Sequence, residues 1–505
     1  MTAPSNLRAA PAESAAMGLP VPSVRGRSLP AGIVAGEAPR GRERLTRLSL
    51  DGRDVPEVDS LLAELSRLPF VESVLGLPDR HQKAQMEVPS SIGIVTRDVL
   101  VPEFTSVAVN DGMGVVLTDL EAAGLTAERI GAFFNRIGSH AAGHVFDTNR
   151  YSLSEDDFRR VLTEGGRAVA ARYGFDPSIV ERMENGACVE VPGVGDRRVT
   201  ARVPWALLHS RFSRSEMGLN FGGNHFLELQ VVDQILDRAV ATRWGLEAGQ
   251  VIVMYHLGPG PFSGTLLHHF SRRTKLDPSR APFFFLSKLL FHYGQRARHG
   301  SRSAKWRTHF RSNRWTPIRA NSEAGEVFRA ALAMATNFGY AYRLATVRAI
   351  FDGLRETISP SVGAELLCDV SHNGIFEEQR DGGRCWVARH NACRLEPGRP
   401  AIVAGAWDVP SQLGIGEAGA GDGLHSYDHG AGHLIERARA ARQLGATRDT
   451  VLRLRMTRGR GARVLGRESV PVLSAGPLDG LMECFADRQL MRSVVRLRPI
   501  GNFKN

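Results

Sequence analysis

The sequence predicts a mixed α/β (α+β) protein, built as one large domain with mixed sheets and flanking helices. Apolar runs with helical periodicity alternate with β-branched runs that are punctuated by glycine. The composition, 43% hydrophobic and 23% charged residues, is that of a globular chain. From residue 41 onward no linker-like break or internal repeat interrupts the pattern. We therefore expect residues 41–505 to form a single domain, although 505 residues would suffice for two.

The predicted elements follow one another in mixed order along the chain. Residues 1–40 are rich in Ala, Pro and Gly without periodicity, which predicts a disordered tail. The helical patterns lie at 58–68, 127–138, 155–173 and 323–354. The strand patterns lie at 91–120, 226–236 and 249–258, and short strands dominate after residue 365.

A basic segment at about 294–320 stands apart from the rest of the chain. It has eight Lys and Arg residues, interleaved with Trp306, Phe310 and Trp315, and no acidic residue between positions 296 and 319. Together with the net charge of +11, this pattern predicts contact with single-stranded RNA, because basic side chains neutralise phosphates and aromatic faces stack on bases. The alternative is a solvated loop whose aromatic residues pack into the core.

Cysteine usage and hydropathy predict a cytoplasmic protein without membrane contact. Five cysteines are scattered without CxxC pairs, which is typical of a reducing compartment. No apolar run reaches the roughly 18 residues of a membrane span, and the N-terminal residues lack the apolar core of a signal peptide. Cys385, His390 and Cys393 could contribute to a zinc site, but no fourth ligand lies at a suitable spacing.

Three histidines occur at a spacing of four in the run LHSYDHGAGHLIE: His425, His429 and His433. On a helix they would share one face and could bind a metal ion. Gly430 and Gly432 disfavour a helix at this place. The run is therefore a metal-binding face, a glycine-lined turn that presents one reactive histidine, or a segment without a chemical role.

Three further histidines lie at strand ends beside Gly or Asn: His225 in FGGNHFLELQ, His256 in VIVMYHLGPG and His372 in CDVSHNGIF. A single histidine in such a place is more often structural, but several together indicate a functional site. Within NHFLE, Asn224 and Glu228 share a face, so they could read a nucleotide while His225 serves a neighbouring region.

Six motifs follow one another along the chain: LPDRHQ (77–82), VNDGMGV (109–115), GGNHFLELQ (222–230), VSHNG (370–374), DHGAGH (428–433) and VVRLRPIGNFK (494–504). In their order and approximate spacing they resemble the motifs of the RtcB RNA ligases. The helical run ALAMATNFGYAYR is also similar, and the resemblance extends from about residue 45 to residue 505. It implies an RtcB-like domain that joins RNA 3′-phosphate or 2′,3′-cyclic phosphate ends to 5′-hydroxyl ends with GTP and manganese, in RNA repair or tRNA splicing.

By this resemblance His429 is the nucleophile that takes GMP, because a neutral imidazole can attack a phosphate and small residues beside it let a nucleotide approach the backbone. His225, His256 and His372 resemble metal ligands suited to manganese or zinc. The positions that the resemblance assigns to the guanine nucleotide are Asn224, His225, Phe226, Leu227, Glu228, His372, Asn373, Ala404, Gly405, Ala406, Trp407, Ser411, His429, Gly430, Ala431, Gly432 and Lys504.

Three expectations follow from these assignments. His425 and His433 become incidental to the chemistry. Lys504 requires the C-terminal tail to fold back into the site. The expected partners are RNA with 3′-phosphate and 5′-hydroxyl ends and GTP, and no motif identifies a partner protein.

The sequence departs from the family pattern at a metal-binding motif. The family's D-x-x-C aligns with Asn110 and Met113, so an amide and a thioether replace a carboxylate and a thiolate. Because two neighbouring dications need anionic ligands, we expect one of two manganese sites to be weakened, with Asn110 and Asp111 as the remaining candidates. The phosphate- and nucleotide-reading positions that also differ from the family are Gly260, His433, Trp407 and Asp408.

These departures leave two alternative functions open. The first is a catalytically silent paralogue that binds RNA through the basic segment. The second is a single-metal phosphoesterase that acts on RNA ends with the same histidines.

Overall fold

The structure, a computed structural model, describes residues 44–50, 55–83, 86–140, 149–193, 199–215, 217–271, 281–299, 314–380, 382–457 and 463–504. The chain divides into two units, Met1–Ala38 and Pro39–Asn505, and every described residue belongs to the second. The predicted tail at 1–40 and residues 300–313 of the basic segment lie outside the described residues.

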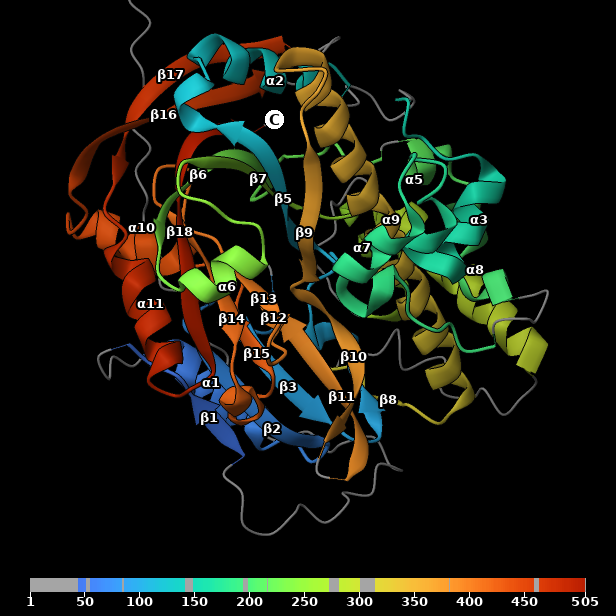
Figure 1. The fold of residues 1–505 in the computed structure, drawn as a ribbon. Helices are drawn as coiled ribbons and strands as arrows, with labels where there is room; N and C mark the ends of the chain where they lie inside the picture. The colour runs from blue at the N-terminus through green and yellow to red at the C-terminus, as the bar shows by residue number, and fades with distance from the viewer. Residues whose placement is uncertain are drawn as a thin grey trace, which may run out of the picture. The chain divides into compact units, whose positions relative to one another are not determined.

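The predicted mixture of helices and mixed sheets is confirmed, and the larger sheet runs through the centre of the second unit (Figure 1). Its described strands have the order β13-β14-β18-β6-β7-β5-β9, and β16 and β17 extend it beside β18. Neighbouring strands are antiparallel except for the parallel pair β16 and β18. The bounds are β5 (Gly112–Glu121), β6 (Phe226–Ile235), β7 (Gln250–Leu257), β9 (Ala364–Ser371), β13 (Pro400–Val403), β14 (Ser411–Gly416), β16 (Ala446–Thr457), β17 (Arg463–Leu473) and β18 (Met491–Lys504).

The smaller sheet has the order β1-β2-β3-β11-β10, and only β1 and β2 are parallel within it. Its bounds are β1 (Leu45–Arg47), β2 (Val71–His81), β3 (Ser90–Thr96), β10 (Asn373–Arg380) and β11 (Gly383–His390). Two short pairs complete the described strands: β4 (Val99–Leu100) with β8 (Ile318–Arg319), and β12 (Ala392–Arg394) with β15 (Ser426–Asp428). Because His372 alone separates β9 from β10, the chain passes from the larger to the smaller sheet at this histidine.

The described α-helices surround these sheets. Their bounds are α1 (Pro56–Ser66), α2 (Ala127–His140), α3 (Glu155–Glu164), α4 (Trp205–Leu208), α5 (Arg211–Ser215), α6 (Arg238–Arg243), α7 (Gly260–Phe270), α8 (Ala281–His299), α9 (Glu323–Thr357), α10 (Gly432–Ala440) and α11 (Gly476–Ala486). The helix predicted at 155–173 ends early, because Gly165 adopts a positive φ of 63°. In the part of the chain that the structure describes, no helix is both long and apolar enough to cross a bilayer.

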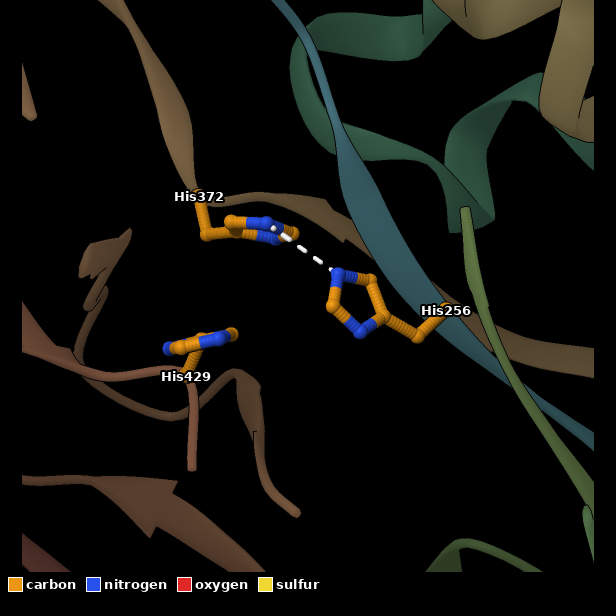
Figure 2. A group of neighbouring side chains, drawn as sticks. All are labelled: His256, His372 and His429. Atoms are coloured by element: carbon orange, nitrogen blue, oxygen red, sulfur yellow. Dashed lines mark hydrogen bonds between the residues drawn. The ribbon is translucent and has the colours of Figure 1, made fainter. Parts of the chain in front are cut away.

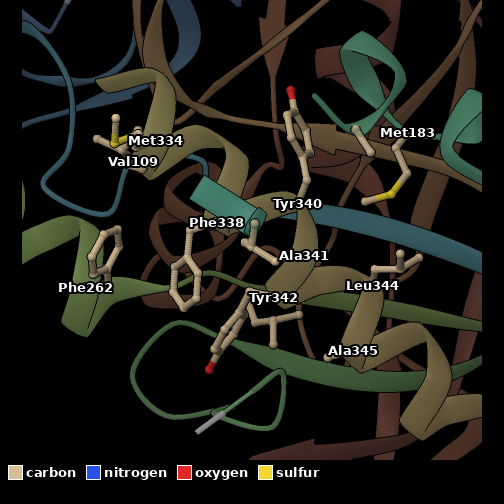
Figure 3. Packing of buried hydrophobic residues seen from close by; sticks show 14 of the residues in the cluster. Val109, Met183, Phe262, Met334, Phe338, Tyr340, Ala341, Tyr342, Leu344 and Ala345 are labelled. Atoms are coloured by element: carbon tan, nitrogen blue, oxygen red, sulfur yellow. The ribbon is translucent and has the colours of Figure 1, made fainter. Parts of the chain in front are cut away.

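Helix α9 forms the centre of one hydrophobic core (Figure 3). The Ser322 hydroxyl accepts a hydrogen bond from the Gly325 N–H and caps the start of the helix. The rings of Phe338 and Phe158 pack edge to face at 5.5 Å. The helix is buried on all sides over most of its length, as expected for a helix that is apolar on every face.

Arg343, in the middle of α9, connects this helix to the larger sheet. Its guanidinium is fully buried and pairs with Asp369 of β9 at 2.7 Å. It also donates a hydrogen bond to the backbone carbonyl of Asn110, directly before β5. A buried arginine therefore holds the loop that leads into the candidate site.

Candidate active site

Four candidate ligands converge at one edge of the larger sheet. Asp111 precedes β5, His225 precedes β6, His256 is the next-to-last residue of β7, and His372 follows β9. In the order β6-β7-β5-β9 the strand directions alternate, so two strand starts and two strand ends meet at this edge. Pairing of His256 with both Phe226 and Met113 fixes the register.

The Asp111 carboxylate faces three imidazoles. Its Oδ2 lies 3.2 Å from His225 Nε2 and 3.7 Å from His372 Nε2, and its Oδ1 lies 3.9 Å from His256 Nε2. The Nε2 atoms of His256 and His372 are 3.3 Å apart. The side-chain donor atoms of Asp111, His225 and His256 all lie within 4.8 Å of one another.

Backbone geometry explains why Asp111, and not Asn110, points into this cluster. Asn110 has a φ of 58°, a left-handed conformation that asparagine tolerates well. Its side-chain amide donates to the Thr336 carbonyl at 2.5 Å and therefore points toward α9. A Cβ atom on Gly258 would lie 2.5 Å from Asp111 Oδ1, so a glycine is needed beside the carboxylate. The Asn110 amide is therefore directed away from the cluster, and its expected place in the metal-ligand set stays a prediction.

His429 joins the same cluster from the turn between β15 and α10. It follows β15, and α10 begins only at Gly432, so His429 lies on a turn as predicted and not on a helical stripe. A Cβ atom on Gly430 would lie 2.7 Å from the Ala404 carbonyl oxygen. The close approach of these two backbone segments therefore requires a glycine at this position. The ring of His429 stacks on that of His372 at 4.7 Å, and the ring of His256 is 5.7 Å away (Figure 2).

Electrostatics divides the cluster into one charged pair and several neutral rings. Burial opposes ionisation of Asp111, but the surrounding histidines hold its pKa well below the usual range. Burial also opposes protonation of His225, but the Asp111 carboxylate raises the pKa of this ring above its usual value. For His256 and His372 burial dominates and lowers the pKa well below the usual value.

The donor set fits a divalent transition-metal ion. Asp111 Oδ1 and His372 Nδ1 are buried and have no hydrogen-bond partner, which is unusual for buried polar atoms. Three imidazoles and one carboxylate are ligands that manganese or zinc accepts. His256, His372 and His429 form a second compact group, so the ring of His429 can act either as a ligand or as a nucleophile.

A cavity of about 460 Å³ opens beside the histidines. Glu228 lies at its wall and accepts hydrogen bonds from Gln230 Nε2 at 2.7 Å and Asn502 Nδ2 at 2.8 Å. Burial raises the pKa of Glu228 to about 7. The Ser411 hydroxyl accepts a hydrogen bond from the Gly405 N–H at 3.0 Å. The volume is within the range of small-ligand sites.

The family model described as tRNA-splicing ligase RtcB matches residues 61–505. The chain belongs to the RtcB family. A tRNA-splicing ligase RtcB from Archaeoglobus fulgidus is 25% identical over 472 residues, covering 87% of this chain and 89% of that protein. One from Pyrococcus furiosus is 27% identical over 367 residues, covering 68% of this chain but 34% of that protein. One from Pyrococcus horikoshii is 26% identical over 418 residues, covering 78% of this chain and 44% of that protein. The chain thus spans less than half the length of the two Pyrococcus relatives.

Most nucleotide positions expected from the RtcB resemblance line the cavity. They are Asn224, Phe226, Glu228, Ala404, Gly405, Ala406, Trp407, Ser411, His429, Gly430, Gly432 and Lys504. His256, which was expected as a metal ligand, also lines the cavity. Lys504 reaches it because the C-terminal residues form β18, an interior strand between β14 and β6.

Five positions expected at the nucleotide are not among the cavity-lining residues. Leu227 is fully buried, because alternation along β6 directs it to the face opposite Phe226 and Glu228. Ala431 is also fully buried, and Asn373 Oδ1 accepts a hydrogen bond from the Asn391 N–H. His225 and His372 lie in the adjoining cluster and not at the cavity wall.

Several cavity residues were missed by sequence reasoning. They are Asp79, His81, Lys83, Asn391, Glu436, Arg453 and Asn502. The LPDRHQ motif contains the first two and was the available signal for them. For Asn391 and Arg453 the sequence carries no comparable signal, because Asn391, between β11 and β12, and Arg453, on β16, reach the cavity only through tertiary packing.

His433, which was expected to be incidental to the chemistry, lies at the cavity wall. Its ring stacks on His81 at 4.6 Å, and both rings line the cavity. Asp79 accepts hydrogen bonds from the backbone N–H groups of His433 at 3.3 Å and Leu434 at 2.7 Å, which caps α10 and holds His433 in place. His425 is not among the lining residues, and its Nδ1 lies 3.2 Å from the Leu395 carbonyl oxygen.

The departure from the family pattern at Trp407 and Asp408 has a structural explanation. Asp408 accepts two hydrogen bonds from Arg439, at 2.7 and 2.9 Å, so its charge is paired. The Arg453 guanidinium lies 4.1 Å above the centre of the Trp407 ring, a cation–π contact at the cavity wall.

At the C-terminal end of the basic segment, the described side chains of Arg314 and Trp315 are paired and packed. Trp315 packs edge to face on Phe104 at 5.3 Å, and Arg314 pairs with Glu64 at 2.8 Å. These contacts agree with the alternative reading at these two positions, and Trp306 and Phe310 lie outside the described residues. Among the described residues, Cys385 and Cys393 belong to neither compact group of metal-ligating atoms.

Proposed function

We propose that this protein is an RNA ligase that joins RNA 3′-phosphate or 2′,3′-cyclic phosphate ends to 5′-hydroxyl ends, with GTP and manganese, through a His429–GMP intermediate. Its biological setting would be RNA repair or tRNA splicing, as the names of its relatives suggest. The observation that carries the proposal is a neutral histidine at the junction of a nucleotide-sized cavity and a carboxylate–histidine cluster.

His429 has the properties of a nitrogen nucleophile. Burial, followed by the charge of Lys83, lowers its pKa to about 3, so the ring is neutral at physiological pH. In the proposed first step a ring nitrogen attacks the α-phosphorus of GTP, an N–P bond forms, and the P–O bond to pyrophosphate breaks. The phosphoramidate then passes GMP to an RNA end.

The cavity supplies groups suited to a guanine nucleotide. Glu228, held by Gln230 and Asn502, presents a carboxyl group to a base. Lys83, Arg453 and Lys504 line the same cavity and offer positive charge to phosphates.

Asp111, His225, His256 and His372 would hold the manganese ion. When bound, such an ion polarises phosphoryl oxygens and stabilises the charge that develops on them. The residues themselves orient one another, because the carboxylate charge keeps His225 close and the neutral rings of His256 and His372 leave nitrogen lone pairs available.

The proposal is tested by incubation with GTP labelled at the α-phosphate and with Mn²⁺. We expect a covalent GMP adduct on the protein, no adduct on His429→Ala, and an adduct on His425→Ala. The second variant is a matched control, because His425 lies directly before β15, four positions from His429, and is not among the cavity-lining residues. Absence of an adduct from the unaltered protein under every divalent metal would reject the ligase reading.

RNA carrying a labelled 3′-phosphate and a 5′-hydroxyl separates the remaining readings. A ligase lengthens the RNA. Loss of the phosphate without lengthening would indicate a phosphoesterase, and salt-sensitive binding that survives both chelation and His429→Ala would indicate a silent RNA-binding paralogue.

A further inference from the structure

Helix α8 carries an exposed apolar surface that the proposed function does not use. Among the described residues, seven large hydrophobic side chains are strongly exposed, and five of them belong to this one helix. They are Phe283, Phe285, Leu286, Leu290 and Tyr293, with exposed fractions of 86%, 56%, 52%, 61% and 63%. Contiguous exposed apolar surface of this kind marks an interaction site.

The opposite face of α8 is anchored to the rest of the unit. Phe291 is buried and packs edge to face on Phe270 at 5.5 Å. His292 Nε2 lies 2.6 Å from the His269 carbonyl oxygen, and Gln295 Nε2 donates to the Ala201 carbonyl at 2.8 Å. The buried face is thus partly polar, and the exposed face, which is apolar, is held in a defined orientation.

Four of the exposed residues form a single stripe. Phe283, Leu286, Leu290 and Tyr293 are separated by three, four and three positions, the spacing of a helix–helix seam. The stripe is also symmetric about position 288, with an aromatic ring at each end and two leucines between. An antiparallel copy of the same helix would therefore set Phe283 against Tyr293 and Leu286 against Leu290.

We infer that α8 pairs antiparallel with α8 of a second copy of this chain, and that the two copies form a symmetric dimer through the Phe283–Tyr293 stripe. A two-fold interface requires a surface that is complementary to itself, and the palindromic spacing provides one. An antiparallel pair also aligns the helix dipoles favourably.

The available area matches a weak dimer. Aromatic side chains offer about 150–250 Å² each, so the stripe exposes roughly 500 Å² per copy and a pair would bury roughly 1,000 Å². This value is at the lower limit for a specific interface, and we expect association at micromolar concentrations.

Sedimentation velocity of the full chain over a micromolar concentration range tests the dimer. We expect a concentration-dependent dimer for the unaltered protein and at least a tenfold rise in the dimer dissociation constant for Leu286→Glu combined with Leu290→Glu. Leu236→Glu is the matched control, because Leu236 is 47% exposed and follows β6; it should leave the dissociation constant unchanged. A monomer at every concentration would overturn the inference, as would equal effects of control and stripe variants.

Disulfide trapping tests the antiparallel register and does not depend on a destabilising substitution. Under mild oxidation, a mixture of Leu286→Cys and Leu290→Cys chains should form a covalent dimer above the background of the unaltered chain. Strong cross-linking of either variant alone would contradict the antiparallel register. A monomeric chain that co-floats with vesicles of phosphatidylcholine and phosphatidylglycerol would overturn the inference in favour of a membrane surface.

Discussion

Replacing Asp111 with asparagine removes a negative charge from the histidine cluster and preserves the size of the side chain. The Asp111 oxygens lie 3.2 to 3.9 Å from the Nε2 atoms of His225, His256 and His372. Two unit charges about 4 Å apart interact by about 4 kcal/mol at an effective dielectric constant of about 20. We therefore expect Mn²⁺ binding to weaken by roughly two to three orders of magnitude, because about 1.4 kcal/mol is tenfold in affinity.

Isothermal titration of the metal-free protein with Mn²⁺ measures this effect. Asp233→Asn is the control, because Asp233 lies on β6 and pairs at the surface with Arg498 at 3.1 Å. Both variants should keep the thermal transition of the unaltered protein. Unchanged Mn²⁺ affinity in Asp111→Asn would refute the assignment of this carboxylate as a ligand.

The same substitution has a second readout that needs no metal. Although burial opposes protonation of His225, the Asp111 charge raises its pKa above the usual value. In metal-free Asp111→Asn the pKa of His225 should therefore fall, which NMR titration of the imidazole resonances would detect. An unchanged pKa of His225 would show that the Asp111 carboxylate and the His225 ring are not neighbours in solution.

Three further substitutions test the supports of the site. Gly258→Ala should weaken Mn²⁺ binding at least about tenfold in the same titration, because the new Cβ would lie 2.5 Å from Asp111 Oδ1. Arg343→Met should lower the free energy of unfolding in urea by about 3–5 kcal/mol, because it leaves the buried carboxylate of Asp369 unpaired. Glu228 has a folded-state pKa of about 7, above its usual 4.5, so the folded state binds the proton more tightly and stability falls as pH rises between these values. Glu228→Gln should remove up to about 1.4 kcal/mol per pH unit of that decline, as measured by urea unfolding at several pH values.

Each of these substitutions has a matched comparison. Gly264→Ala should leave Mn²⁺ affinity unchanged, because its Cβ would have 3.8 Å of space. Arg314→Met removes an exposed pair with Glu64 and should cost about 1 kcal/mol or less. For Glu228→Gln the comparison is the slope of unfolding free energy against pH in the unaltered protein. An equal slope in the variant would show that the Glu228 carboxyl ionises normally.

At the family's aspartate position this chain has Asn110, but the neighbouring residue, Asp111, still supplies a carboxylate to the site. Met113 is fully buried in a hydrophobic core, on β5 opposite His256. The positive φ of Asn110 rotates the chain so that the next side chain, Asp111, faces the histidines. The thiolate has no such replacement in the compact metal-ligating groups of the described residues.

The sequence by itself determined the mixed fold, the long helix near 323–354, and the placement of His225, His256 and His372 at strand ends. These features depend on local periodicity, on glycine and asparagine beside a strand, and on ordered motifs, all of which are contained in short segments. The position of His429 on a turn was predictable for the same reason, since Gly430 and Gly432 disfavour a helix there.

Only the tertiary structure decided which side chains meet. The choice of Asp111 over Asn110 depends on one backbone angle and on Arg343, more than 200 positions away. The entry of His433 into the cavity depends on Asp79, which caps α10 from a distant strand. Contacts between segments far apart in sequence are set by sheet order and register, and no local pattern encodes which strand will lie beside which.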